Sequence, residues 1–333
     1  MPEKLEQASN FSNKMWNAAK FIIMNTPEKE KLIKFREENY NEKENLYKEG
    51  SLKLEDKWII NKTNKLVSEI TTNIDNYDLG IAIDKLYSFI WNEFCDWYIE
   101  FAKISLYSGA DEEKVQTAYV LNEVFRTCLK LLHPFMPFVT SEIYNDLVNY
   151  DDKDLMVSEW PKAKSEDGKF EYDSEEEIIE KIKEIIVEIR NVRSTKNIHP
   201  SKKAELILVT NRYRDELKQA EGILLKLGFA DSVKIQDNSN NISENSIHIV
   251  TDGIEVYIPL EGLIDLEEEK KRIEQERKRL QSEIERCEKM LSNPGFMNKA
   301  PQTKIDEEKE KLAKYKEMLS ALGALGTAPN CTK

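Results

Sequence analysis

The chain has 333 residues, of which 33% are charged and 40% hydrophobic, and its formal net charge is −13. This length allows about two or three domains, and the composition is typical of a helix-rich protein with a substantial core. No apolar run approaches the roughly 20 residues that cross a bilayer, and residues 1–4 carry no apolar signal segment. The cysteines form no C-x-x-C pair, so we expect neither a disulfide framework nor a metal site, and the expected compartment is the cytoplasm.

The acidic total charge argues against nucleic-acid binding, but the charge is unevenly distributed. Salt screens charges over roughly 8–10 Å, so local segments matter more than the total. Residues 265–317 carry 14 acidic and 14 basic residues, and residues 4–24 carry three lysines and one glutamate. Any RNA contacts are therefore expected in these two segments.

Residues 1–163 predict an antiparallel bundle of about five helices. Apolar residues recur at spacings of three and four, as in Phe11, Met15 and Ile22. Breakers such as Ser108-Gly109 mark short loops, which make successive helices antiparallel neighbours. The polar stretch 28–49 is predicted to be a mobile connection. Phe135 and Phe138 are predicted to plug the end of the bundle.

Residues 164–262 predict a small α+β domain. A helix over 174–196 precedes a strand over 204–210, and a second helix over 213–227 is expected to end at Gly228 as a left-handed cap. Asp252-Gly253 predicts a tight hairpin. The remaining strands are expected at 232–236, 247–250 and 254–258.

Residues 263–322 predict an antiparallel coiled-coil hairpin. Leu266, Ile273, Leu280 and Cys287 are spaced by sevens, and an Asn-Pro-Gly breaker separates them from a second apolar stripe that begins at Ile305. The first helix, 263–291, is expected to be about 40 Å long. The small, polar tail 323–333 is predicted to be flexible. The predicted fold class is therefore mainly α, with one small mixed domain.

No catalytic centre is expected in this chain. Amino-acid activation on a parallel sheet needs a His-x-Gly-His signature, and none of the three histidines stands in such a setting. There is also no phosphate-binding glycine loop.

The first helix can be interpreted as a platform for single-stranded RNA. In this interpretation Phe21 stacks on a base, Lys14 and Lys20 meet phosphates, and Asn17 bonds a base edge. The alternative is a fully packed helix with two solvated lysines. For the hairpin, the alternative to RNA binding is a coiled coil whose charges only form pairs within each helix.

Several motifs together resemble one family. The segment from Asn13 to Phe21 (NKMWNAAKF), Trp91-x-x-Phe94-x-Asp96-Trp97-Tyr98 and the HPFMPF run at 133–138 resemble the anticodon-binding bundle of class I aminoacyl-tRNA synthetases of the isoleucine, leucine and valine group. Residues 190–203 resemble the linker domain that follows that bundle. The final hairpin, with Phe296, Lys299 and Pro301 at its turn, resembles the C-terminal arm of valyl-tRNA synthetases.

The resemblance implies that the chain is the tRNA-binding part of a longer valine-specific synthetase, which ligates valine to its tRNA with ATP and Mg²⁺ in catalytic and editing domains that precede Met1. It implies anticodon contacts at Lys14, Asn17, Lys20, Phe21 and Ile83. Relatives commonly have arginine at the position of Lys20, so a phosphate contact is expected there instead of a bidentate base contact. The residues expected to bind the tRNA elbow are Arg272, Arg279, Lys289 and Lys299.

The expected partner is valine-specific tRNA, bound by a monomer, with no role for DNA or a membrane. Two alternatives stay open from the sequence. One is the same region of an isoleucyl- or leucyl-type synthetase. The other is a non-enzymatic helical adaptor whose hairpin pairs with another protein.

Overall fold

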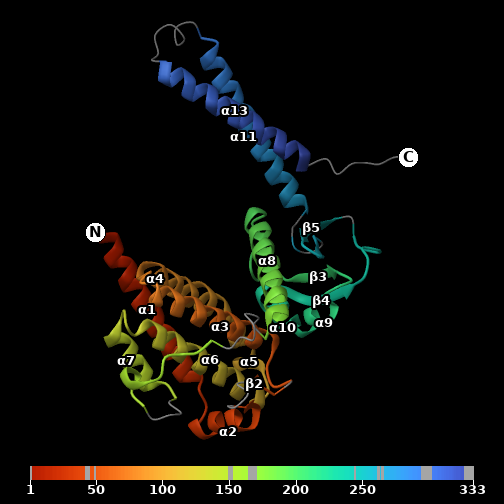
Figure 1. The fold of residues 1–333 in the computed structure, drawn as a ribbon. Helices are drawn as coiled ribbons and strands as arrows, with labels where there is room; N and C mark the ends of the chain where they lie inside the picture. Colours follow the sequence, from red (N-terminus) through yellow and green to blue (C-terminus); the bar gives the residue numbers. More distant parts are fainter. Residues whose placement is uncertain are drawn as a thin grey trace. The chain divides into compact units, whose positions relative to one another are not determined.

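A computed structural model describes residues 2–41, 46–48, 50–148, 153–163, 171–243, 245–260, 263, 266–293 and 302–325 (Figure 1). The chain divides into two compact units, residues 1–259 and residues 260–333. None of the helices in the described ranges combines the length and the apolarity that a membrane crossing requires.

The first part of unit 1 is a helical bundle (Figure 1). Its longest helix is continuous through α4 (Leu79–Ser88), the π-helical η1 (Phe89–Tyr98) and α5 (Ile99–Ser108). The other helices are α1 (Pro2–Asn25), α2 (Lys29–Asn39), α3 (Leu54–Asp75), α6 (Asp111–Leu132) and α7 (Pro137–Asp146). Short elements complete this part, namely β1 (Tyr40–Asn41), β2 (Leu46–Tyr47) and the 3₁₀ turn η2 (Leu155–Val157).

The prediction of a mobile connection at 28–49 is wrong for its first half. Residues 29–39 form α2, and Leu32 is fully buried against the bundle. Phe35 also packs on the bundle, with its ring 5.2 Å from that of Tyr119 on α6, and so few apolar residues give only a weak periodic signal. Residues 42–45 and 49 lie outside the described part.

A buried polar network joins three helices at the centre of the bundle. The Asp56 carboxylate on α3 accepts hydrogen bonds from the Tyr98 hydroxyl (2.7 Å) and the Gln116 side-chain amide (2.6 Å). Buried polar groups need such partners, and these come from η1 and α6. The network therefore fixes the mutual positions of α3, η1 and α6.

A mixed domain completes unit 1, and it is built around α8 (Asp173–Thr195). The sheet has the order β4-β3-β6-β5, with β3 and β4 parallel and the other pairs antiparallel. Its strands are β3 (Ala204–Val209), β4 (Ala230–Gln236), β5 (Ser246–Thr251) and β6 (Ile254–Pro259). The isoleucine stripe of α8, from Ile178 to Ile189, is buried. These elements agree closely with the predicted ranges.

Polar contacts tie α8 to α3 and hold the mixed domain on the bundle. The Trp58 indole donates to Glu180 at 3.0 Å, and Asn61 donates to Asp173 and Glu176 at 2.9 and 2.8 Å. Several of these groups are part-buried, so solvent screens them less than surface pairs.

The helix predicted over 213–227 is interrupted, and its predicted cap is wrong. Ala220 separates α9 (Arg214–Gln219) from α10 (Glu221–Leu227). Gly228 keeps a right-handed conformation (φ −84°), and Phe229 takes the left-handed one (φ 55°). The Phe229 ring lies 5.1 Å from the Arg193 guanidinium, so a tertiary contact favours an aromatic residue where the local rule expects glycine.

The two-residue hairpin at Asp252-Gly253 is confirmed, and it gives a stability prediction. Gly253 has φ 83°, and a Cβ there would lie 3.1 Å from the Tyr213 ring. We expect Gly253→Ala to lower the free energy of unfolding by about 1–2 kcal/mol, measured by urea denaturation. Gly80→Ala is the matched control because it lies in α4 with open space around it, and it should leave stability unchanged or slightly raised. Equal effects of the two substitutions would contradict the prediction.

Unit 2 consists of α11 (Leu266–Leu291) and α13 (Gln302–Leu325), which lie side by side as a helical hairpin (Figure 1). Leu280, Cys287 and Ile305 are buried in its narrow seam. α13 continues two residues past Gly323, so the start of the predicted flexible tail is helical, and residues 326–333 lie outside the described part. The mainly α fold class, with one small sheet domain, is confirmed.

Candidate nucleic-acid interface

Helix α1 turns one side into the bundle and leaves the other partly open. Phe11, Met15 and Ile22 are buried on the inner side. The open side, called the α1 face, carries four of the predicted RNA-binding residues. Asn17 and Lys20 are exposed, whereas Lys14 and Phe21 are half-buried.

Lys14 is engaged within the protein. Its Nζ lies 2.6 Å from Asp96 Oδ1 and 3.9 Å from the centre of the Trp91 ring. A phosphate at Lys14 must therefore compete with a carboxylate, which also repels it. The structure favours a role for Lys14 in orienting Trp91 over a direct phosphate contact.

Lys20 and Phe21 are better placed for RNA. Lys20 is exposed and pairs with no described carboxylate. Lys103 Nζ lies 5.7 Å from the Phe21 ring, and Lys103 itself pairs with Glu100 at 2.6 Å. Asn17, one turn earlier on α1, has an exposed amide that can donate and accept. Asn17, Lys20 and Phe21 together give the last turns of α1 a polar and aromatic surface.

Ile83 lies away from that surface. Side-chain contacts pair Phe11 with Tyr87 and Lys14 with Trp91, so α1 runs parallel to the long α4–η1–α5 helix. Lys103, the neighbour of Phe21, follows Ile83 by 20 residues, or roughly 30 Å along that helix. The five residues predicted to meet the anticodon therefore extend along the bundle instead of forming one cluster.

Two aromatic residues extend the α1 face beyond the predicted set. Tyr87 stacks on Trp91 with ring centroids 5.6 Å apart and an interplanar angle of 18°, and it also contacts Phe11 at 4.8 Å. Tyr87 and Ile83 are partly exposed, at 36% and 41%. The spacing of four residues between Ile83, Tyr87 and Trp91 is the sequence signal that places them on one side of a helix.

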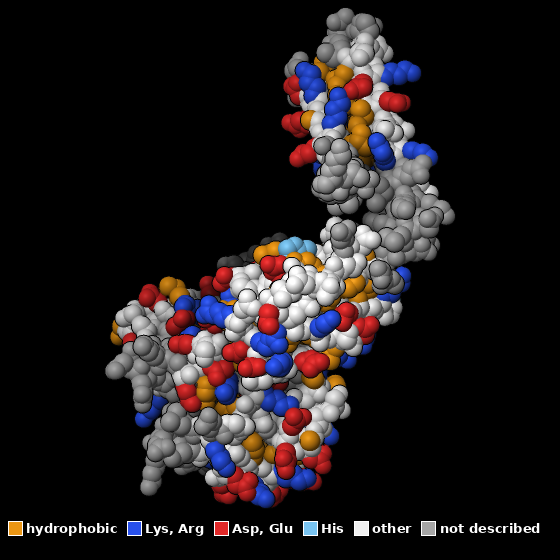
Figure 2. Space-filling view, turned by 90° about the vertical axis from the view of Figure 1, so that its right-hand side faces the viewer, with side chains coloured by type: hydrophobic (Ala, Val, Ile, Leu, Met, Phe, Trp, Pro, Cys, Tyr) orange, Lys and Arg blue, Asp and Glu red, His pale blue; other side chains and the backbone are white. Residues whose placement is uncertain are grey.

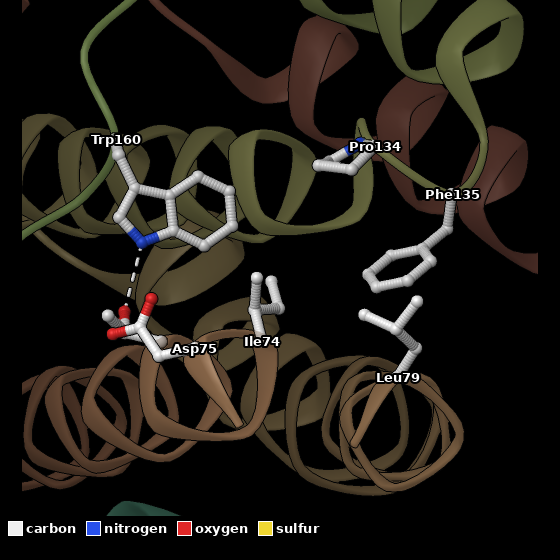
Figure 3. Close-up of a pocket in the computed structure, with 7 residues that line it drawn as sticks. Ile74, Asp75, Leu79, Pro134, Phe135 and Trp160 are labelled. Carbon is white, nitrogen blue, oxygen red and sulfur yellow. Dashed lines mark hydrogen bonds between the residues drawn. The ribbon is translucent and has the colours of Figure 1, made fainter. Parts of the chain in front are cut away.

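A hollow of about 390 Å³ lies at the α3–α4 turn (Figure 3). Trp160 forms one wall and donates its indole N–H to Thr71 at 2.9 Å. Pro134, Phe135 and Leu79 line the remainder, and Asp75 stands at the Trp160 end. Its walls are mostly apolar, and the Asp75 carboxylate disfavours a phosphate. A planar uncharged group is the ligand that suits this hollow.

The prediction that both phenylalanines plug the bundle end is wrong for Phe138. Phe135 is half-buried in the hollow, whereas Phe138 at the start of α7 is 90% exposed. Pro137 occupies the first position of α7, where a proline is well tolerated. Phe138 is the second residue of α7, and its side chain points to solvent.

The surface of unit 2 alternates in charge. Figure 2 shows an apolar stripe on this unit flanked by both basic and acidic side chains. Lys316 pairs with Glu288 across the two helices at 2.8 Å, and Arg286 pairs with Glu283 at 2.9 Å. Part of the positive charge of this hairpin is therefore already neutralised.

The structure describes the side chains of two of the four predicted elbow residues. Lys289 is exposed near the end of α11 and pairs with no described carboxylate. Arg279 is exposed and already has an interaction within the protein. Arg272 lies on α11, but its side chain is outside the described part, as is the whole of Lys299.

Comparison with known proteins identifies both regions. Residues 56–208 match a family described as the anticodon-binding domain of tRNA ligases, and residues 265–324 match the valyl-tRNA synthetase tRNA-binding arm. The first match begins after α1, so the residues of the α1 face lie outside it.

Longer proteins are similar to nearly the whole chain. It is 41% identical over 323 residues to the valine–tRNA ligase of Clostridium acetobutylicum, and 36% identical over 315 residues to that of Bacillus subtilis. These alignments cover 96% and 94% of this chain but only 35% and 34% of the relatives, so the chain spans about a third of their length. Because an anticodon-binding domain and a valyl-type arm follow one another on one polypeptide, the chain belongs to the valyl-tRNA synthetase family.

Proposed function

We propose that the chain binds valine-specific tRNA as a monomer through two surfaces, with the anticodon on the helical bundle and the elbow on the α11–α13 arm. The observation that carries this proposal is the presence of both domain types on one chain, each named for a tRNA contact. A folded RNA that touches both surfaces binds more tightly than either contact alone allows, because the second contact becomes intramolecular.

We further infer that the chain works within a longer valine–tRNA ligase, which joins valine to this tRNA with ATP in the cytoplasm. The relatives are valine–tRNA ligases about three times as long as the matched region. ATP and Mg²⁺ are assigned to the catalytic domain of that longer protein. No catalytic residue is assigned to the present chain, whose contribution is to select and orient the tRNA.

The α1 face is the proposed anticodon contact. The ring of Phe21 offers a surface on which an unstacked base can stack, and the exposed Lys20 lies beside it for the adjoining phosphate. The Asn17 amide can bond a base edge. Lys14 contributes indirectly, because its contacts with Asp96 and Trp91 fix the aromatic surface beside it.

Substitution of Phe21 and Lys20 tests this assignment. We expect Phe21→Ala to weaken binding of a valine tRNA transcript by about 5- to 150-fold, since base stacking contributes about 1–3 kcal/mol. Lys20→Ala should weaken it less and should lower its salt dependence, because one phosphate contact is lost. Fluorescence anisotropy titrations at several salt concentrations measure both effects.

Two exposed residues away from the α1 face provide controls. Phe138→Ala removes an exposed aromatic ring from α7, and Lys218→Ala removes an exposed lysine from α9. Both should leave tRNA affinity within about twofold of the wild type. If Phe21→Ala and Lys20→Ala also bound normally, the anticodon would not lie on this face.

A further inference from the structure

The segment 190–203, at the end of α8 and in the turn that follows, is the most basic part of unit 1. It carries five basic residues and no acidic one, in a chain whose net charge is −13. The five are Arg190, Arg193, Lys196, Lys202 and Lys203. Its resemblance to the linker domain of the family does not by itself explain this concentration of charge.

Three of the five charges in this segment pair with no described carboxylate, unlike many other charges on unit 1. Many lysines elsewhere on the bundle and on α8 pair with carboxylates, as Lys62, Lys65 and Lys183 do. By contrast, Arg190, Lys196 and Lys203 pair with no carboxylate in the described ranges, and Arg190 and Lys203 are exposed. Because no acidic residue of the segment neutralises these three charges, they produce a local positive field, even though the net charge of the chain is negative.

A buried arginine holds this turn in one shape. Arg193 is 5% exposed, and its guanidinium donates to the carbonyl oxygens of His199 (3.0 Å) and Lys202. The Ile198 amide donates to the Arg193 carbonyl at 2.8 Å, which closes the end of α8. Asn197 adopts the left-handed conformation (φ 51°) that such a helix end requires. The basic side chains are therefore presented from an ordered backbone, at a low entropic cost of binding.

A hollow of about 360 Å³ adjoins the turn. Arg190, Ser194 and Asn197 supply hydrogen-bond donors to its wall, Phe229 supplies an aromatic surface, and no acidic residue is among its described lining. Arg190 also lies 5.6 Å from the Trp97 ring, which fixes the guanidinium beside the bundle. Guanidinium, hydroxyl and amide donors around one recess form a surface that suits a phosphodiester oxygen.

We propose that residues 190–203 and this hollow bind the sugar-phosphate backbone of the tRNA as a third contact, separate from the α1 face and from the arm. This proposal rests on the proposed function for the identity of the RNA. The contact is independent of base sequence, because backbone contacts position an RNA without identifying its bases. It strengthens binding and fixes the orientation of the tRNA, while the anticodon contact supplies selectivity.

The test removes three of these charges from the full chain. We expect the R190A/K196A/K203A variant to bind a valine tRNA transcript at least about tenfold more weakly at 0.1 M salt. The slope of log K against log salt should fall by about 2–3, since each phosphate contact contributes about 0.9. The preference for valine transcripts over other tRNAs should not change. The K196Q/K203Q variant keeps Arg190 and Arg193 and should show a smaller loss, which tests the proposal even if the triple variant folds poorly.

A matched triple variant sets the baseline. K218A/K226A/K234A removes the same charge from α9, α10 and β4 and should change affinity by less than about twofold, with a smaller change in slope. If the two triple variants bound alike, the third contact would be refuted. If the wild-type chain showed no preference for valine transcripts, the proposed function would fail instead, and the salt slope with any folded RNA would still report on residues 190–203.

Discussion

The Glu55→Gln variant is expected to be more stable than the wild-type chain, and the difference should grow as the pH rises. Glu55 lies in the first turn of α3 with 8% of its surface exposed. Burial raises the pKa of this carboxyl to about 7, and the neighbouring Asp56 carboxylate adds to the shift. Glutamine keeps the shape of the protonated acid and removes the cost of ionising it.

The direction of the effect follows from proton linkage. The pKa of Glu55 is higher in the folded chain than the ordinary value of 4.5, so the folded state holds its proton more tightly than the unfolded state does. The stability that this proton provides is complete below about pH 4.5 and is lost as the pH rises through about 7. The total loss is about 3 kcal/mol, which is a large part of the stability of an ordinary domain.

Urea denaturation at pH 5.5, 7.0 and 8.5 measures this effect. The advantage of Glu55→Gln over the wild type should grow by about 2 kcal/mol across that range. Leu54→Ala is the control, because it changes the adjacent buried residue without adding or removing a titrating group. Its difference from the wild type should stay constant with pH, and a constant difference for Glu55→Gln would refute the raised pKa.

The strands and long helices of this chain were predictable because their patterns are repetitive. The isoleucine stripe of α8 and the Asp-Gly turn after β5 each combine several independent signals, and both are confirmed. Features that depend on a few tertiary contacts were not predictable. α2 depends on the packing of Leu32 and Phe35 on the bundle, and the left-handed Phe229 contacts Arg193, which is distant in sequence.

The side of α1 that stays open to solvent was predictable from the sequence, whereas the pairing of its charged side chains was not. The sequence pattern identified the open side of α1, but it could not show that Lys14 is occupied by Asp96, which lies 82 residues away. The family resemblance also grouped Ile83 with Phe21, although the contacts of α1 with α4, η1 and α5 place them far apart along the bundle. A charged residue is useful to a ligand only if its neighbours leave it free, and pairing of this kind is invisible without the fold.

Removal of unit 2, by ending the chain after Pro259, is expected to reduce tRNA affinity by about a hundredfold or more while leaving unit 1 folded. Unit 1 holds its own core, from Met15 to Val256, and the arm buries only a narrow seam of its own. The loss is large because linking two contacts on one ligand commonly raises affinity by about 10²–10⁴ over one contact.

Anisotropy titrations of the shortened chain with full-length tRNA and with an isolated anticodon hairpin distinguish the possible roles of the arm. The hairpin RNA has no elbow, so the shortened and complete chains should bind it with the same affinity. A difference that appears only with full-length tRNA therefore locates the arm contact outside the anticodon hairpin. If the shortened chain bound full-length tRNA as tightly as the complete chain, the hairpin of α11 and α13 would not be an RNA contact, and its exposed charges would have to serve protein pairing instead.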